Sequence, residues 1–140
     1  MMPDSYPVRL PIRIDWSEMD LFGHVNNVSY FKYIQAARVN YWETVGISSL
    51  KEGGKGPMLL STSCRFKQPL YYPGNIIIVS SVTFIKNTSF GISHLILNEN
   101  DEIAAEAEDV IVMYDFNVNE KIQVPADLRS KIEALERKQY

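Results

Sequence analysis

The chain of 140 residues and 16.0 kDa is long enough to bury a core, and we expect residues 1–140 to form one domain. Its 14 basic and 17 acidic residues give a net charge of -3, and the scattered basic residues exclude nucleic acid as a partner. The one cysteine, Cys64, excludes an internal disulfide and a multi-cysteine metal site and fits a cytoplasmic location. The sequence shows neither a signal peptide nor a run of ~20 apolar residues, so we expect no membrane insertion.

A strand and a long helix are predicted in the first third of the chain. Residues 8–16 alternate between apolar and polar side chains, which is typical of a half-buried strand, and Pro11 favours an edge or a bulge. A loop at residues 17–25 follows. Apolar residues then recur at helical spacing over 27–45 and predict a largely buried helix: Tyr30, Ile34, Ala37, Tyr41 and Val45, with Val28, Phe31 and Trp42 widening the stripe. Asn26 or Asn27 suits its N-cap, and Gly46 suits its end.

The rest of the chain is rich in strands. We predict a loop at residues 51–57 and strands at 58–66, 75–86, 90–98 and 102–116, of which the last three form an antiparallel meander across short polar turns. Residues 125–138 carry apolar residues at helical spacing and predict a short amphipathic tail helix. A sheet that wraps the one apolar helix buries it economically, so the fold class is α+β.

A candidate active site lies between the first strand and the long helix. A helix start offers unpaired backbone N–H groups and the positive end of the helix dipole, which together polarise a carbonyl. Asp20 lies beside this helix start and supplies a base or nucleophile, although a loop aspartate also caps turns. Asp15 and Glu18 are weaker candidates, because the end of a strand and the start of a polar loop are usually solvated.

Five short segments resemble one known family. They are DLFGHVNN at residues 20–27, YFKY at 30–33, AR at 37–38, RFKQPL at 65–70 and PGN at 73–75. In this order they resemble the hotdog-fold acyl-CoA thioesterases of the 4-hydroxybenzoyl-CoA thioesterase type. The resemblance implies a curved antiparallel sheet wrapped around one long central helix, and homodimers joined through their sheets that often pair into homotetramers with sites at the dimer interface.

The resemblance also implies roles for the loop. The acid at the position of Asp20 acts on the thioester as nucleophile or as general base for water, while backbone N–H groups near the helix start hold the thioester oxygen. The substrate-binding residues would then be Gly23, His24, Val25, Asn26 and Asn27. Structural roles compete with substrate contact here, since a histidine can brace the loop, an asparagine can cap the helix and a glycine can serve a positive φ.

Other polar residues also have two interpretations. Arg65, Lys67 and Lys86 can meet the phosphates of coenzyme A, although charged residues are common on exposed strand faces. Cys64 is interpreted as a small buried hydrophobe, and His94 as structural or exposed.

The sequence therefore predicts a thioesterase that hydrolyses acyl-CoA without a metal or redox cofactor. Two alternatives stay open. One is an acyl carrier protein thioesterase, for which the basic loop at residues 51–55 is the hint. The other is a non-catalytic acyl-CoA binding module, which Gln35 favours because relatives often carry a glutamate in that stretch of the helix.

Overall fold

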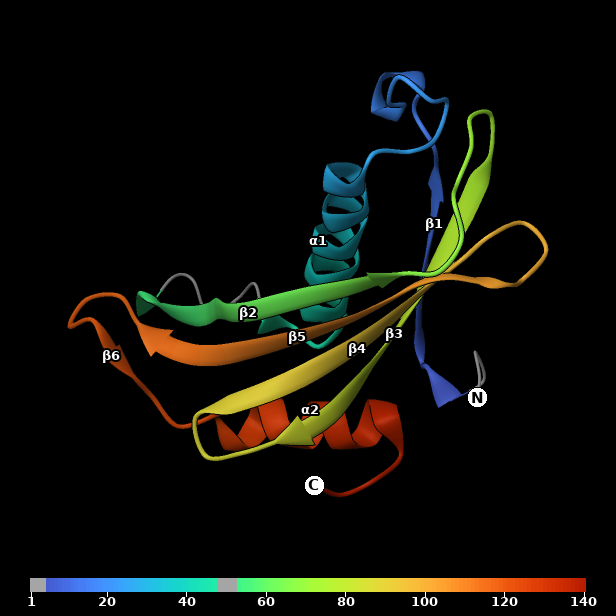
Figure 1. Cartoon of the computed structure of the whole chain (residues 1–140). Helices are drawn as coiled ribbons and strands as arrows, with labels where there is room; N and C mark the ends of the chain where they lie inside the picture. Colours follow the sequence, from blue (N-terminus) through green and yellow to red (C-terminus); the bar gives the residue numbers. More distant parts are fainter. Residues whose placement is uncertain (1–4, 48–52) are drawn as a thin grey trace.

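An antiparallel sheet and a long helix packed against it dominate the computed structural model, which describes residues 5–47 and 53–140 (Figure 1). The strand order is β1-β3-β4-β5-β2, with β6 paired to β5. The strands are β1 (Val8–Arg13), β2 (Lys55–Phe66), β3 (Asn75–Ile85), β4 (Ser89–Leu97), β5 (Ile103–Asp115) and β6 (Glu120–Lys121). The helices are a 3-10 helix (Trp16–Glu18), α1 (Asn27–Thr44) and α2 (Ala126–Glu136). In the described part of the chain, neither α1 nor α2 is long and apolar enough to cross a membrane.

The sheet confirms the predicted meander and corrects the start of β2. β3, β4 and β5 pair in sequence order, and β1 with its Pro11 is an edge strand, as predicted. The predicted loop at residues 51–57 was wrong for its last three residues, because Lys55, Gly56 and Pro57 pair with the end of β5. β2 is the opposite edge strand, where a proline that lacks an N–H is tolerated.

Helix α1 buries one face against the sheet and leaves the other exposed. The predicted stripe is confirmed at Tyr30, Ile34, Ala37, Tyr41 and Val45, all of which are buried. The prediction was wrong for Val28, which is 65% exposed. Val28 lies in line with Lys32, Gln35 and Val39 at helical spacing, on the face that points away from the sheet.

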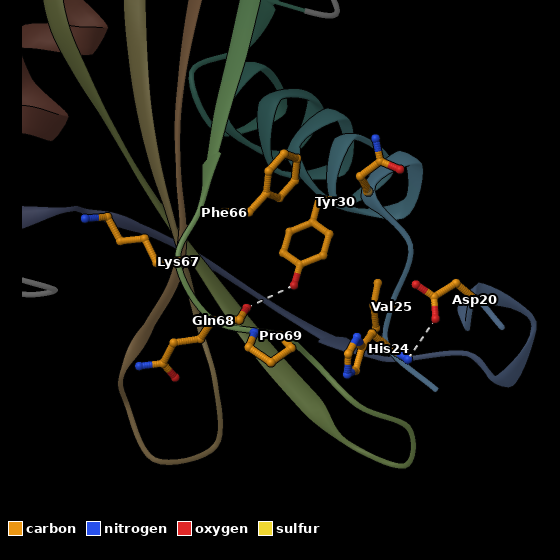
Figure 2. Close-up of a pocket in the computed structure, with 9 residues that line it drawn as sticks. Asp20, His24, Val25, Tyr30, Phe66, Lys67, Gln68 and Pro69 are labelled. Carbon is orange, nitrogen blue, oxygen red and sulfur yellow. Dashed lines mark hydrogen bonds between the residues drawn. The ribbon is translucent and has the colours of Figure 1, made fainter. Parts of the chain in front are cut away.

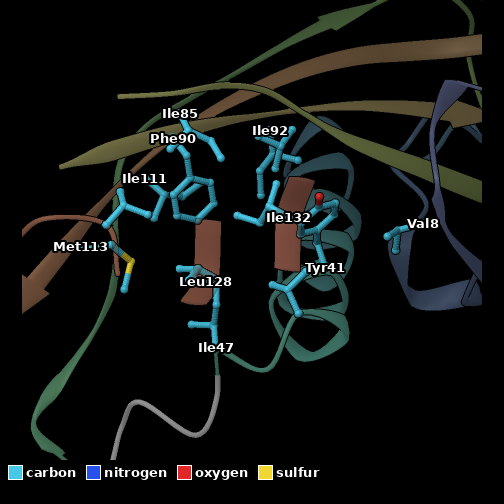
Figure 3. Close-up of a cluster of buried hydrophobic side chains, with 13 residues drawn as sticks. Val8, Tyr41, Ile47, Ile85, Phe90, Ile92, Ile111, Met113, Leu128 and Ile132 are labelled. Atoms are coloured by element: carbon cyan, nitrogen blue, oxygen red, sulfur yellow. The ribbon is translucent and has the colours of Figure 1, made fainter. Parts of the chain in front are cut away.

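Helix α2 confirms the predicted amphipathic tail. Leu128 and Ile132 pack in one cluster with Phe90, Ile92 and Tyr41, so both helices contribute to the same core (Figure 3). Pro125 is the N-cap rather than a residue of the first turn, and its fixed φ suits either position. Glu136 then ties α2 to its neighbours, because its carboxylate accepts hydrogen bonds from the Tyr41 hydroxyl (2.6 Å) and the Val82 N–H (2.8 Å).

A chain of polar side chains crosses the core beneath α1. His94 Nδ1 shares a hydrogen bond of 2.7 Å with the Ser80 hydroxyl, and His94 Nε2 lies 2.8 Å from Asp109 Oδ2. Arg38 donates to both oxygens of Asp109 at 2.9 and 3.2 Å. Burial raises the pKa of Asp109, but the hydrogen bonds from His94 and Arg38 outweigh it and lower that pKa to about 2. Of the two interpretations of His94, the exposed one was wrong, since its side chain is fully buried.

Candidate active site

A cavity of about 380 Å³ opens where the loop after β1 meets the first turn of α1 and the segment that follows β2 (Figure 2). It brings together five of the predicted site residues: Asp20, His24, Val25, Asn27 and Lys67. Its remaining lining comes from Tyr30, Phe66, Gln68 and Pro69. Gly23, Asn26, Arg65 and Lys86 are absent from the lining residues of this cavity.

Asp20 is an exposed, ionised carboxylate that is also held by its own loop. Its Oδ1 accepts hydrogen bonds from the backbone N–H groups of Phe22 (2.8 Å) and His24 (3.1 Å). The bonds from His24 and Phe22 lower the pKa of Asp20 below its ordinary 3.8, because they stabilise the charged form. The turn-capping interpretation of Asp20 is therefore confirmed, and the same contacts keep a charged carboxylate at the cavity.

Gly23 serves the loop conformation. Its φ of +84° lies in the left-handed region, where glycine avoids the strain of a side chain. A Cβ built at this position would meet nothing within 4 Å, so the space around Gly23 does not itself require a glycine. Its N–H donates to the Asp20 carbonyl (3.2 Å) and closes the turn that presents the Asp20 side chain.

The backbone N–H groups available to a ligand lie at the first residues of α1. Asn26 is the N-cap, as one of the two predictions had it, and its side-chain oxygen accepts from the Ser29 N–H (2.8 Å). The N–H groups of residues 23–26 all have acceptors within the loop or in Leu70. The N–H groups of Asn27 and Val28 donate to no acceptor within residues 5–47 and 53–140. They are the orphan donors that a helix start is expected to leave.

Phe66, Gln68 and Pro69 line the cavity and were not predicted as part of the site. The Tyr30 hydroxyl donates to the Gln68 carbonyl (3.1 Å), and the Tyr30 and Phe66 rings meet edge to face at 5.0 Å between centroids (Figure 2). Tyr30 was predicted as a core residue, and with 4% exposure it is one, although its edge also faces the cavity. Phe66 and Gln68 belong to the RFKQPL segment, in which Arg65 and Lys67 were the predicted site residues.

The cationic candidates separate in space. Lys67 lies at the cavity and forms an exposed ion pair with Glu106 (3.7 Å). Arg65 is exposed on β2 opposite Glu106, so it lies near Lys67 on the sheet. Lys86 follows the far end of β3, where its ammonium lies 5.0 Å from the centre of the Phe84 ring. Of the three, the structure brings Lys67 to the cavity.

Two other predicted features can be compared with the structure. Cys64 is half-buried on β2, and burial raises the pKa of its thiol to about 11. Glu18 was predicted to be solvated, and this was wrong, because it is 8% exposed and accepts a hydrogen bond from the Tyr33 hydroxyl (2.6 Å). Within the described residues, no group of three or more His, Cys, Asp or Glu side chains is placed to hold a metal ion.

The chain is similar to known thioesterases in sequence and in fold. Residues 14–132 match the thioesterase-like superfamily. A protein of Arabidopsis thaliana named acyl-acyl carrier protein thioesterase ATL3, chloroplastic, is 27% identical over 93% of this chain and 68% of that protein. The structure of the PA5185 protein from Pseudomonas aeruginosa is 27% identical, covers 95% of this chain and 94% of its own, and has a TM-score of 0.84.

A thioesterase from Thermus thermophilus, solved with coenzyme A and zinc, is 23% identical and covers 98% of this chain and 99% of its own, with a TM-score of 0.86. At that identity the similarity shows the fold, and it confirms the predicted hotdog architecture. The superfamily match spans most of the chain and includes the Asp20 loop, α1 and the strands from β2 to β6. The chain therefore belongs to the thioesterase-like superfamily, and it is a thioester hydrolase with the hotdog fold.

Proposed function

We propose that this thioesterase hydrolyses acyl-CoA to the free acid and coenzyme A at the Asp20 cavity. One observation carries the proposal: the charged Asp20 and Asn27, whose backbone N–H at the start of α1 has no acceptor, line the same cavity. Hydrolysis of a thioester needs a base or nucleophile and a site for the developing oxyanion, and we assign these roles to Asp20 and to the N–H groups at the start of α1.

The reaction begins at the thioester carbonyl carbon. Asp20 either removes a proton from water as the water attacks, or attacks directly to form an anhydride that water then cleaves. The carbonyl oxygen gains negative charge and accepts from the N–H groups of Asn27 and Val28, where the helix dipole adds to its stabilisation. Collapse of the intermediate breaks the carbon–sulfur bond, and the coenzyme A thiolate leaves and takes up a proton.

The residues around Asp20 suit the rest of this substrate. His24, Val25 and Phe66 can contact the acyl group or the pantetheine arm, and Lys67 can meet a phosphate if it releases Glu106. The Thermus thermophilus relative was solved with coenzyme A, which supports this ligand class. We also propose a cytoplasmic location, which the unpaired thiol of Cys64 supports.

A carrier-protein thioester is the second candidate substrate, and the name of the Arabidopsis relative favours it. The two substrates share the pantetheine arm and the thioester, so they place the same demands on Asp20. They differ at the far end of that arm, where coenzyme A carries a phosphorylated nucleotide. Of the basic loop proposed to meet a carrier protein, residues 51 and 52 lie outside the described residues, and Lys55 is exposed at the start of β2.

We further propose that the protein is a homodimer joined through β2, which two dimers can extend to a homotetramer. β2 is an edge strand of 12 residues that exposes Leu60 (57%) and Phe66 (47%), and an uncovered edge of this length favours pairing with a second copy. In an antiparallel pair centred on Leu60, the start of β2 in one copy meets the end of β2 in the other. A second cavity of about 600 Å³, beside Val39 and Pro57, then opens toward the partner's Asp20 cavity.

The proposed function is tested by thiol release from short, medium, long-chain and aromatic acyl-CoA with wild type and Asp20→Asn. The asparagine keeps an oxygen to accept from Phe22 and His24, so the loop should stay folded while the charge is lost. We expect the rate to fall at least about a hundredfold. The matched control is Asp101→Asn, at an exposed turn residue with a φ of 61°, which asparagine also adopts, and its rate should not change. Equal rates of thiol release for wild type and Asp20→Asn would show that Asp20 takes no part in the chemistry. If wild type releases no thiol from any acyl-CoA, the carrier-protein substrate or the non-catalytic binding module is favoured.

A further inference from the structure

Glu18 is a buried carboxylate just before Asp20, and it lies outside the cavity. Its Oε1 accepts from the Tyr33 hydroxyl (2.6 Å) and the Asp15 N–H (2.9 Å), and its Oε2 lies 3.2 Å from the Lys32 ammonium. Tyr33 and Lys32 belong to α1, so the side chain of Glu18 fastens the loop to the helix. Burying a charge is costly, and a carboxylate is kept inside a protein only where its partners satisfy it.

The backbone of Glu18, like its side chain, is held by hydrogen bonds. Its carbonyl accepts from both the N–H and the side-chain amide of Asn26, each at 2.9 Å. The bridge between Met19 and Val25 and the bond from the Asp20 N–H to the His24 carbonyl (2.7 Å) continue this pairing. Residues 18–26 thus form a small hairpin whose base is Glu18 and Asn26 and whose far end carries Asp20.

We propose that Glu18 is a positioning residue that sets the place of Asp20 relative to the first turn of α1. This inference rests on the proposed function, because it assigns the position of the Asp20 carboxylate to the hairpin base. A shift at that base moves Asp20 and Asn26 relative to each other, and a displacement of about 1 Å can cost up to about a hundredfold in rate.

The charge state of Glu18 supports this role. Burial raises its pKa, but the hydrogen bonds from Tyr33 and the Asp15 N–H outweigh burial and lower the pKa below its ordinary 4.5. The groups facing it are the Tyr33 hydroxyl and the Lys32 ammonium on α1 and the Asp15 N–H in its own loop. The carboxylate therefore stays charged through neutral pH, and the contacts persist in the range where a hydrolase works.

The test compares Glu18→Ala and Glu18→Gln with wild type in two measurements. The first gives kcat and KM on an acyl-CoA that wild type hydrolyses. The second gives the hydrogen-exchange rates of the Phe22 and His24 amides. Alanine removes every side-chain contact, whereas glutamine keeps an oxygen for Tyr33. We expect Glu18→Ala to lower kcat at least about tenfold with KM within about twofold, and to speed exchange at both amides. Glu18→Gln should keep most of the wild-type kcat and most of the wild-type protection of the Phe22 and His24 amides from exchange.

Glu136→Ala is the matched control. Glu136 is a carboxylate that also accepts from a tyrosine hydroxyl and a backbone N–H, but it does so at α2. We expect this variant to lose stability and to keep its kcat below its melting temperature. The inference is overturned if folded Glu18→Ala keeps the wild-type kcat, or if Glu136→Ala loses as much kcat for the same loss of stability.

Failure of the proposed function gives a different result. If Asp20→Asn is as fast as wild type, or wild type releases no thiol, the chemistry assigned to Asp20 is wrong. The exchange rates of Phe22 and His24 then still decide whether Glu18 holds the hairpin. Unchanged exchange in Glu18→Ala would contradict the positioning role in every case.

Discussion

Lys67 lines the Asp20 cavity, and its side chain extends away from Asp20 toward Glu106 (Figure 2). We propose that its ammonium contacts the phosphates of coenzyme A there. We expect Lys67→Met to raise KM for acyl-CoA about threefold to tenfold and to leave kcat unchanged, because an exposed contact to the nucleotide contributes equally to ground state and transition state. The measurement uses acyl-CoA and the N-acetylcysteamine thioester of the same acyl group, which lacks the nucleotide. KM for the truncated substrate should not change.

The control for this variant is Lys121→Met, on the short exposed strand β6. It removes the same charge from the molecule without touching the cavity. An equal rise in KM for both thioesters would contradict a phosphate contact and place Lys67 beside the acyl group or the pantetheine arm. An unchanged KM for acyl-CoA would exclude Lys67 as a contact to the phosphates.

The site residues differ in how well the sequence reveals them. Asp20, His24 and Asn27 lie within eight residues of one another, so a short motif was enough to predict that they share a site. Glu18 lies just outside that motif, and its burial was predicted wrongly, because a charged side chain in a polar loop is usually solvated. Its burial depends on Tyr33, 15 residues away on α1, and a local pattern does not report such a contact.

At the scale of elements, periodicity predicted what packing then confirmed. The predicted ends of α1 and of the β3–β4–β5 meander lie within about two residues of the observed ends, because each element has an unbroken pattern and is bounded by clear turns. β2 was predicted three residues short, since Gly56 and Pro57 favour turns in isolation. Pairing with β5 overrides that preference, and the identity of the partner strand is not a local property of the sequence.

The exposed edge of β2 predicts the oligomeric state. We expect light scattering to give about 32 kDa, or twice that, for a chain of 16.0 kDa. Leu60→Lys should shift the protein toward 16.0 kDa, because it places a charge at the centre of the proposed strand pair. Val118→Lys is the control, since Val118 is equally exposed (58%) and lies between β5 and β6. A 16.0 kDa wild-type particle at micromolar concentration would exclude the proposed dimer.

At the scale of the whole molecule, the Arg38–Asp109 pair ties α1 to the middle of the sheet. The pKa of Asp109 falls from its ordinary 3.8 to about 2 on folding, so its charge adds stability above pH 3.8 that is lost as the pH falls toward 2. This difference corresponds to about 2 kcal/mol. Asp109→Asn leaves the Arg38 charge buried and unpaired, which typically costs about 3–5 kcal/mol at neutral pH.

Urea unfolding from pH 7 to pH 2 tests this assignment. The difference in stability between wild type and Asp109→Asn should narrow as the pH approaches 2, because wild type then loses the same charge. A constant difference would show that Asp109 is not the group that titrates. If Asp109→Asn does not fold, the urea experiment is replaced by a carbon-13 NMR titration of the Asp109 carboxyl in wild type. A titration midpoint near pH 4 would contradict the lowered pKa.

This network was beyond the reach of sequence analysis. Arg38 and Asp109 are 71 residues apart, and His94 and Asp109 are 15 apart on neighbouring strands. Each residue alone has an ordinary interpretation, as a helix landmark, a strand carboxylate or a strand histidine. Only the register of β4 against β5 and the placement of α1 over both strands bring them together.

The order of contacts in this network has a consequence for identifying enzymes by geometry. Ser80, His94 and Asp109 follow one another in the order of the nucleophile, base and orienting acid of a serine hydrolase. The two ring nitrogens are exchanged, because Ser80 contacts Nδ1 and Asp109 contacts Nε2, whereas in a serine hydrolase the serine contacts Nε2 and the acid contacts Nδ1. All three are 1% exposed or less, so no acyl group can reach the Ser80 oxygen without opening the core. A search that compares only the residue types and their order would therefore select the wrong nucleophile in this chain, although the chain is itself a hydrolase. Here depth from the surface, together with the exchanged ring nitrogens, separates a structural hydrogen-bond relay from a reactive one.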